Sequence, residues 1–553
     1  MEKFKGLLVA STFAAVANYV VGLADPVIAG NLMGPVALAG VNLAAPIISF
    51  SQFLSFLIAI GVGTCYSISL GRCDKRRADE YFTQGLWSIV LLCGALSLAM
   101  LFGGDTLIAF FRPTPEIAEA FRSYLTFISP IPLLQGFVFF FVTMAYADGA
   151  ARLAMIANGV LLAGSVGFSI LGIKLGFGLE GCAAGTVLAT LLALVILVGR
   201  LFLPSNTLRV VRHFAFRDTF KIGAASFGDA AASLCQSLLL FFLNAFVVRQ
   251  FGAEVLPIVG VATVVWGFLV IFDSIGNAAQ PIVTVYFGEG NYPAIRRVMN
   301  AAMKVCLFEG VTLAAIFLLF PEFVVRAVGI SDPEMFAQAI SAVRGVAVAF
   351  IAFPFAGLFN SYYMFIERPL LAGVLTFLAY LIVPVASIAM GSLVSIDYVW
   401  AGLSFGVFAG ILMALIVIYA TTGKSSVPLL LPNVKEGLIR VFDLSLEDAE
   451  IAEVSRRVAG IPDVPMKASL MVEEVLEVVR ERNRGRRILG EVTVDLTDGV
   501  KLTIRDDGQI FDITDADQQI SSLRSFLVAS IMERQSNKIN IITTGYNRNV
   551  FRF

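Results

Sequence analysis

The stretch from Leu32 to Leu70 contains no charged residue. A helix rises about 1.5 Å per residue, so the helical part of this stretch alone exceeds a hydrocarbon core of about 30 Å. The stretch follows an apolar segment that holds Asp25, and it ends at a basic loop that begins at Arg72. The same succession returns in residues 241–297. We therefore interpret the chain as a tandem duplication of membrane-spanning segments.

Composition supports a polytopic membrane protein. Mean hydropathy is +0.84, 58% of the residues are hydrophobic and only 15% are charged. The charges gather in short loops and in the C-terminal part, so the net charge of −1 says little about partners and gives no sign of nucleic-acid binding. The six cysteines form no CxxC pair, so we expect neither disulfides nor zinc, and we expect no cofactor.

Apolar windows of about twenty residues predict six spans in each copy. In the first copy they lie near 7–30, 38–70, 85–104, 124–146, 155–176 and 181–203. In the second copy they lie near 222–248, 255–287, 301–325, 341–365, 370–390 and 399–420. The predicted fold is an all-α polytopic membrane protein with twelve transmembrane helices in two six-helix repeats, 1–210 and 211–424, plus a small cytoplasmic α+β domain.

The repeat is supported by landmarks that recur 217 to 219 residues apart. They are Gly34 and Gly252, Gly71 and Gly288, the Pro115-Glu116 and Pro333-Glu334 turns, and Asp148 and Glu367. Because six spans is an even number, both copies begin on the same side of the membrane, and a pseudo-twofold axis along the membrane normal relates them. We expect the transport cavity at the seam between the copies.

The basic residues of the short loops predict the orientation. With the N-terminus inside, most of them lie on the cytoplasmic side, including Arg72, Lys75, Arg209 and Lys424. We expect both termini in the cytoplasm and the protein in the bacterial cytoplasmic (inner) membrane.

Beyond Tyr419 the composition changes to that of a soluble domain. Residues 425–435 form a turn-rich linker, and 436–553 carry acids and bases at ordinary frequency. The pattern predicts amphipathic helices near 446–459 and 465–483, then the strands EVTVDLT and VKLTIRD. A helical stretch, SSLRSFLVASIMERQ, and two strands in NKINIITTGY and NVFRF complete a small α+β sandwich.

Residues 1 to about 424 resemble the multidrug and toxic compound extrusion (MATE) family. The resemblance is carried by LADPVIAGNLMGPVALAGVNLAAP in the first copy, by RQFGAEVLPIVGVATVV and AAQPIVTVYFGEGN in the second, and by the YADGAARLAM turn. It implies a V-shaped exporter of twelve helices that exchanges protons or sodium ions for organic, often cationic, solutes.

One departure from the family concerns the fifth span. Members coupled to protons or sodium ions usually place there an Asp that works with the Asp of the first span. Here the span reads NGVLLAGSVGFSILG and supplies only Ser165 and Ser169. We expect a weakened or rebuilt cation site in the first half.

Residues 436–553 resemble the GHKL ATPase fold of anti-sigma-factor kinases. IRDDGQIFD, with Asp506 and Gly508, is similar to the box that binds the adenine amino group, and Glu474 lies in the helix that would carry the magnesium-binding Asn. Val478 replaces that Asn, and the glycine-rich lid is replaced at 521–523. We expect a degenerate, regulatory module with weak or absent nucleotide binding, and a cytoplasmic protein is a possible partner for it.

Asp25 is the strongest candidate for binding the coupling cation. An ionised carboxylate within a bilayer is costly unless it faces a cavity or a partner. Pro26 removes a helical N–H and leaves a carbonyl oxygen free as a ligand. The alternative is that Asp25 is simply solvated in the outer interface.

Asp229 and Asp273 are further candidates for cation coupling. No acid lies at their equivalents in the first copy, so the repeat does not require them, and either function or solvation of a cavity explains them. For Glu309 we favour a charge that snorkels or pairs locally near Lys304.

Amide side chains inside the spans are candidates for lining the solute cavity. They are Asn42, Gln52, Gln236, Asn244, Gln280 and Asn360. The alternative is that they hydrogen-bond between helices.

The sequence favours a secondary exporter of small organic solutes in the lipid bilayer, and not an enzyme. Two alternatives remain. A flippase for lipid-linked saccharides needs a cationic cavity, but the predicted spans contain few deep Lys or Arg residues. A membrane-tethered sensor needs a functional nucleotide-binding domain. The replacement of the magnesium-binding Asn and of the glycine-rich lid argues against it.

Overall fold

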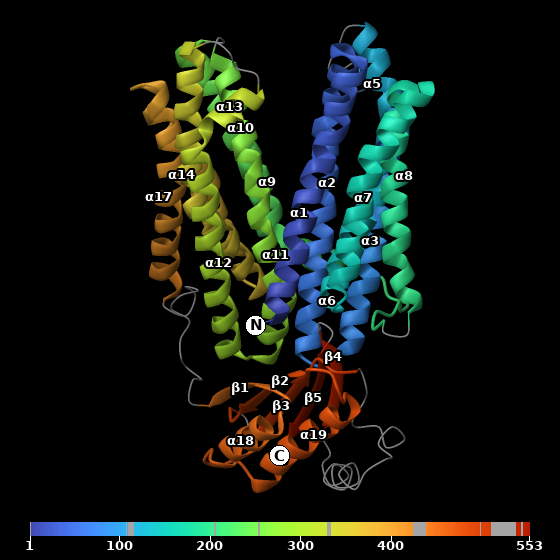
Figure 1. The fold of residues 1–553 in the computed structure, drawn as a ribbon, viewed down its shortest axis with the longest axis vertical. Coiled ribbons are helices and arrows are strands. Elements are labelled where there is room, and N and C mark those ends of the chain that lie inside the picture. The colour runs from blue at the N-terminus through green and yellow to red at the C-terminus, as the bar shows by residue number, and fades with distance from the viewer. Residues whose placement is uncertain are drawn as a thin grey trace.

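The computed structural model describes residues 2–104, 106, 108, 115–203, 206–252, 255–328, 333–423, 438–497, 499–509, 538–543 and 546–553. Two helical bundles lean apart at one end of the molecule and meet at the other, and the C-terminal domain lies beneath the end where they meet (Figure 1). We call these the far end and the domain end.

The first bundle contains the helices of the first copy. They are α1 (Glu2–Met33), α2 (Pro35–Gly71), α3 (Lys75–Phe102), α5 (Pro115–Ile128), α6 (Ile131–Ala147), α7 (Ala151–Gly172) and α8 (Gly178–Gly199), with the short turns η1 (Ile173–Phe177) and η2 (Arg200–Phe202).

The second bundle contains the helices of the second copy. They are α9 (Phe216–Phe251), α10 (Leu256–Gly267), η4 (Phe268–Phe272), α11 (Asp273–Glu289), α12 (Tyr292–Leu319), α13 (Pro321–Val328), α14 (Pro333–Phe365), α15 (Pro369–Phe377), η5 (Leu378–Ile382), α16 (Val383–Ser392) and α17 (Ile396–Thr422).

The described helices agree with twelve membrane crossings. Ten are long and apolar enough to span, or eleven if α5 and α6, bent by 43° at their break, form one span. One of the ten, Ala151–Phe202, runs for 52 residues and contains both α7 and α8. The chain reverses within it at Gly176, where φ is 90°, and an added Cβ on Gly172 would lie 2.5 Å from the Gly181 oxygen. This stretch is therefore a hairpin of two spans, which gives the predicted number.

The duplication is also visible in the backbone. Positive φ angles recur at matching places: Gly34 and Gly252 have 91° and 85°, and Gly149 and Glu367 have 76° and 57°. Each pair is separated by the offset found in the sequence. Such angles are costly for a residue with a Cβ, so their repetition reflects a shared backbone path.

The bundles touch along a seam formed by α1 and α2 on one side and α9 and α11 on the other. At the domain end, Gly71 of α2 meets Gly288 of α11, and a Cβ on either would lie 2.9 Å from the other's Cα. These glycines are equivalent positions of the two copies. A contact between equivalent positions lies on the axis that relates them, so the pseudo-twofold passes through the point where the domain end is closed.

The C-terminal domain is an antiparallel sheet with two helices. The strands are β1 (Ile439–Ser445), β2 (Leu489–Asp495), β3 (Lys501–Asp506), β4 (Lys538–Thr543) and β5 (Tyr546–Arg552), and the helices are α18 (Asp448–Ala459) and α19 (Met466–Arg482). The strand order is β1-β2-β3-β5-β4, with every pair antiparallel. The fold class predicted from the sequence is confirmed. β1 was not predicted, and the predicted helix at 521–535 lies outside the described residues.

The two faces of this sheet have different partners. Val492, Leu502, Ile504 and Phe551 form a buried core with α18 and α19. Side chains alternate between faces along a strand, so the neighbouring polar residues point the other way, towards the bundles. Arg505 on that second face is nevertheless only 5% exposed.

Candidate transport site

Asp25 lies two turns before the end of α1, next to Pro26. The proline removes the hydrogen bond that the Gly22 carbonyl would otherwise accept within the helix. The Asp25 side chain is buried, with 5% of its surface exposed. The simple alternative, a carboxylate solvated in the interface, does not describe this environment.

Hydroxyl groups surround the Asp25 carboxylate. Tyr124 of α5 donates to Oδ2 at 2.7 Å, and Thr186 of α8 donates to Oδ1 at 2.8 Å. Ser169 of α7 lies 3.4 Å from Oδ1, but its single proton is closer to the Cys182 carbonyl, at 2.9 Å. A carboxylate with two good hydroxyl donors retains some of the stabilisation that it loses by leaving water.

Neutral hydroxyls thus occupy the place where a second carboxylate was expected from the family pattern. Ser169 was identified from the sequence, but Tyr124 and Thr186 were not. Their signal is weak, because a lone Thr or Tyr in an apolar span is common. Only the tertiary structure brings the three residues to one carboxylate.

Asp25 faces a cavity of about 340 Å³ inside the first bundle. Besides Asp25, its polar lining includes Asn18, Gln52, Gln135 and Thr190. The Oε1 atom of Gln135 is buried without a hydrogen-bond partner among the described residues. The cavity therefore offers polar groups that a small cation or water can satisfy.

A second cavity, of about 160 Å³, lies at the seam, where the sequence predicted it. It is lined by α1, α2 and α6 of the first bundle and by α9, α11 and α14 of the second. Asp229 and Asp273 both line this central cavity. The structure therefore brings together two carboxylates that are 44 residues apart in the sequence.

The two carboxylates have different surroundings. Asp229 is half-buried, and its Oδ1 accepts from the Asn360 amide at 2.8 Å. Thr376 donates to the Asn360 oxygen at 3.0 Å and so fixes the orientation of that amide. Asp273 is exposed to the cavity. The central cavity therefore gives access to negatively charged groups between the two bundles.

Four of the six predicted amides line a cavity. Gln236 and Asn360 line the central cavity, and Gln52 lines the cavity of Asp25. Gln280 also lines the central cavity, but its amide donates across the seam to the Ile60 carbonyl at 2.8 Å, so it also joins the bundles.

Two predicted amides lie elsewhere or are not described. Asn244 donates to the Leu240 carbonyl of its own helix at 2.9 Å. The side chain of Asn42 lies outside the described residues.

For Glu309, predicted to snorkel or to pair locally, the described contacts do not show the local pairing. Glu309 is half-buried in α12, and in the part of the chain that the structure describes its Oε2 is buried without a hydrogen-bond partner. Lys304 is exposed, and no ion pair between the two is among the described contacts.

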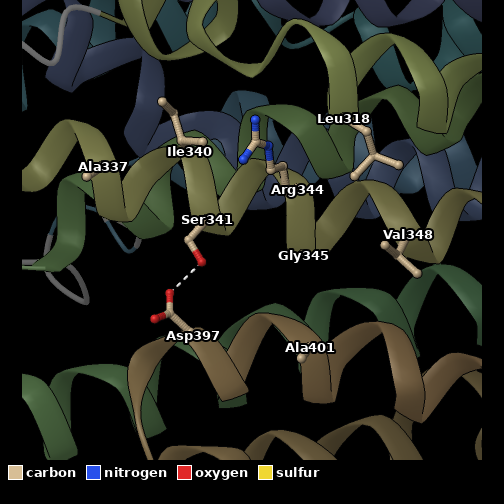
Figure 2. A pocket seen from close by; sticks show the side chains of 9 residues that line it. All are labelled: Leu318, Ala337, Ile340, Ser341, Arg344, Gly345, Val348, Asp397 and Ala401. Atoms are coloured by element: carbon tan, nitrogen blue, oxygen red, sulfur yellow. Dashed lines mark hydrogen bonds between the residues drawn. The ribbon is translucent and has the colours of Figure 1, made fainter.

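A third hollow, of about 420 Å³, opens on the second bundle between α14 and α17. Figure 2 shows Ser341 pointing to Asp397, to which its hydroxyl donates a hydrogen bond, with Arg344 one turn further along α14. Asp397 and Arg344 are both exposed. The lining of this hollow includes none of the acids predicted to bind the coupling ion.

In the C-terminal domain, Asp506 is fully buried at the end of β3. Its Oδ1 accepts from the Gly508 backbone at 3.1 Å and from the Asn547 amide at 2.8 Å. Burial raises the pKa of Asp506 to about 6. Glu474 is half-buried in α19. The predicted lid position, 521–523, lies outside the described residues.

Two helical bundles with polar cavities at and beside their seam have the architecture of a membrane transporter. The sequence profile of the MatE family matches residues 10–170 and 230–389, one segment in each copy and together more than half of the chain. The chain belongs to this family of multidrug and toxic compound extrusion transporters and is a multi-pass membrane protein.

Similar proteins agree with this assignment. The chain is 26% identical to Protein DETOXIFICATION 44, chloroplastic, of Arabidopsis thaliana over 375 residues, which cover 63% of this chain and 70% of that protein. A solved MATE structure in complex with MaL6 has a TM-score of 0.69 at 20% identity, covering 76% of this chain and 96% of its own. A MOP superfamily transporter from Pyrococcus furiosus has a TM-score of 0.68 at 20% identity with the same coverage.

Proposed function

We propose that this transporter is a secondary antiporter, which uses a proton or sodium gradient to extrude organic, cationic solutes. The observation that carries the proposal is the division of acids between two cavities. Asp25 is enclosed in the first bundle, whereas Asp229 and Asp273 line the cavity between the bundles.

The central cavity favours a cationic solute. Its described lining contains two carboxylates, several amides and aromatic rings, and neither lysine nor arginine. A cation gains Coulomb energy from both acids and stacks on aromatic faces such as those of Phe139 and Tyr380. The pyrophosphate of a lipid-linked saccharide would be repelled there, so the flippase alternative is disfavoured.

Asp25 is the proposed site of the coupling ion. A bare carboxylate in a bilayer costs on the order of 3 kcal/mol, and binding a proton or sodium ion removes most of that cost. If the closed state of the cavity excludes water better than the open one, ion binding favours the closed state. A gradient then drives the exchange of conformations because ion binding is linked to conformation.

We also propose that both termini are cytoplasmic and that the protein lies in the bacterial inner membrane; loop charge supports the orientation. The starts of α3 and α12 and the end of α8 lie at the domain end (Figure 1), and basic residues, Lys75, Arg296 and Arg200, lie at or near these helix ends. Positive loops mark the cytoplasmic side. The far end is then extracellular, and the bundles are open towards the outside.

We also propose that the C-terminal domain regulates transport and does not catalyse. Its sheet is docked against the helix ends, and Asp506 already has two partners within the domain. A nucleotide amino group would have to reach the other oxygen, Oδ2, which is buried and has no hydrogen-bond partner among the described residues. We expect calorimetry to detect weak or absent nucleotide binding, and Asp506→Asn to leave that result unchanged.

Efflux of a cationic dye from vesicles, under imposed proton and sodium gradients, tests the proposal. We expect a gradient of one of these ions to drive efflux by the wild type, and Asp25→Asn to lose that dependence. Asp397→Asn is the matched control, because this exposed acid lies outside both cavities. Efflux that survives both Asp25→Asn and the collapse of both gradients contradicts an ion-coupled mechanism.

A further inference from the structure

The second face of the C-terminal sheet carries a row of charged residues that crosses four strands. In the register of the sheet, Asp443 of β1 lies opposite Glu491 of β2, Glu491 opposite Arg505 of β3, and Arg505 opposite Arg548 of β5. Residues that are paired in register point to the same face. The four side chains therefore form one line, with two acids followed by two arginines.

This row faces a matching row on the domain end of the second bundle. Arg297 of α12 pairs with Asp443 at 2.7 Å and with Glu491 at 3.5 Å, and Tyr286 of α11 donates to Glu491 at 2.9 Å. Glu289, the last residue of α11, pairs with Arg505 and with Arg548. The two acids of the sheet thus contact Arg297 of the second bundle, and the two arginines of the sheet contact Glu289.

Arg548 reaches both bundles at once. Its Nε lies 3.0 Å from Glu289 of the second bundle. Its two terminal nitrogens donate to the Leu70 and Gly71 carbonyls of the first bundle, at 2.9 and 3.0 Å. Those carbonyls end α2, where the helix dipole is negative and a cation is favoured. No surface of Arg548 is exposed.

The arrangement is costly unless both bundles are in place. Arg505 and Arg548 are like charges directly opposite each other in the sheet, which is unfavourable without a counter-charge. Glu289 supplies that charge to both. Arg505 also pairs with Glu491 and so keeps a partner within the domain. Separation of Glu289 from the first bundle would make the buried Arg548 give up either Glu289 or the carbonyls of α2, and a buried guanidinium that loses hydrogen-bond partners is destabilised.

The contact lies where the bundles must separate. Gly71 and Gly288 touch on the pseudo-twofold; Arg548 binds the carbonyl of Gly71 itself, and both Arg505 and Arg548 pair with Glu289, the residue after Gly288. Opening of the domain end requires the ends of α2 and α11 to part. One guanidinium spans only a few ångströms, so Arg548 cannot follow both helix ends.

We propose that the C-terminal domain is a clamp that holds the domain end of the transporter closed, through the row Asp443, Glu491, Arg505 and Arg548. The clamp favours the conformation that is open at the far end. By linkage, any ligand or protein that binds the undocked domain favours opening of the domain end. The clamp depends on alternating access, and it is independent of the solute and the coupling ion.

Distances between spin labels at the far end test the clamp. Leu32→Cys on α1 and Leu319→Cys on α12 are exposed positions, used in a Cys73→Ser background because the other cysteines are buried. In detergent without solute or gradient, we expect the full-length chain to show mainly the long distance. Glu289→Gln, and separately deletion from residue 425, should each increase the short-distance population at least threefold.

Lys467→Ala is the control, because Lys467 is exposed on α19, away from the docked face, and it should leave the distances unchanged. Deletion without any shift overturns the clamp. A shift on deletion but none with Glu289→Gln overturns the role of the charge row. The measurement does not involve transport, so failure of the proposed antiport leaves it interpretable.

Discussion

The acid of the first bundle and the acids of the second differ in access, although they belong to copies of one scaffold. Asp25 is enclosed by hydroxyls of α5, α7 and α8, whereas Asp273 is exposed to the cavity at the seam. Hydroxyls cover most of the Asp25 carboxylate, which leaves its oxygens accessible to a bare ion, although the cavity beside it, at about 340 Å³, is larger than the central one. An open pair of carboxylates suits a larger cation.

This difference shows which features the two copies still share after duplication and which have diverged. The backbone path is retained, as the matching positive φ angles and the Gly71–Gly288 contact indicate. Polar side chains are not retained, because no acid of the first copy matches Asp229 or Asp273. In the proposed mechanism the two copies of one bundle divide two tasks, ion coupling and solute binding, which a single symmetric site would have to combine.

The largest effect on transport is expected when the cavity aspartates of each bundle are replaced by asparagine, which removes the charge. We expect Asp25→Asn to lower gradient-driven efflux at least tenfold for every solute, because the coupling ion loses its ligand. The double variant Asp229→Asn with Asp273→Asn should lower efflux of cationic solutes only. Initial efflux rates of a cationic and a neutral substrate measure this, and equal losses for both solutes in both variants would remove the distinction.

A smaller effect is expected from the donors around each acid. Tyr124→Phe removes one hydrogen bond to a charged group, worth roughly 1.5–3 kcal/mol. The carboxylate then binds a proton more tightly, so the pH at which efflux is half-maximal should rise. Asn360→Leu, beside Asp229, should instead weaken solute binding and leave that midpoint in place. The pH profile of transport separates the two variants.

A substitution at the close contact between the bundles should destabilise the fold moderately. Gly71→Ala places a Cβ 2.2 Å from the Val285 carbonyl and should cost about 1–3 kcal/mol. Gly373→Ala meets nothing within 4 Å inside a helix, so it should be neutral or stabilising by up to about 1 kcal/mol. Thermal unfolding in detergent compares them, and equal melting temperatures would mean that the close contact can relax.

The smallest effect concerns the pH dependence of the C-terminal domain. Because burial raises the pKa of Asp506 from 3.8 to about 6, the folded domain binds a proton more tightly than the unfolded chain. This acid therefore lowers stability as the pH rises from about 4 to 6, and about 1 kcal/mol of the loss falls between pH 5 and pH 7. Protease resistance of the domain in the full-length protein should be higher at pH 5 than at pH 7, and Asp506→Asn should reduce that difference.

The sequence predicted the large features because they depend on local chemistry. Uncharged stretches and recurring glycines are sufficient to indicate spans and a repeat, and acids in apolar segments are rare enough to stand out. Tyr124 and Thr186 were missed because a hydroxyl gains its role only from the carboxylate that it meets. Arg548 was missed for the same reason, since an arginine on an alternating strand is usually solvated, and here the docked bundles bury it.

Ion release on solute binding tests the division between the two cavities most directly. Purified protein in weakly buffered detergent solution is mixed with a cationic dye, while a pH indicator or a sodium-sensitive probe reports the released ion and dye fluorescence reports binding. We predict that Asp25→Asn binds the dye as the wild type does but releases no ion, and that Asp229→Asn with Asp273→Asn loses dye binding. Ion release of normal size from Asp25→Asn would contradict the account.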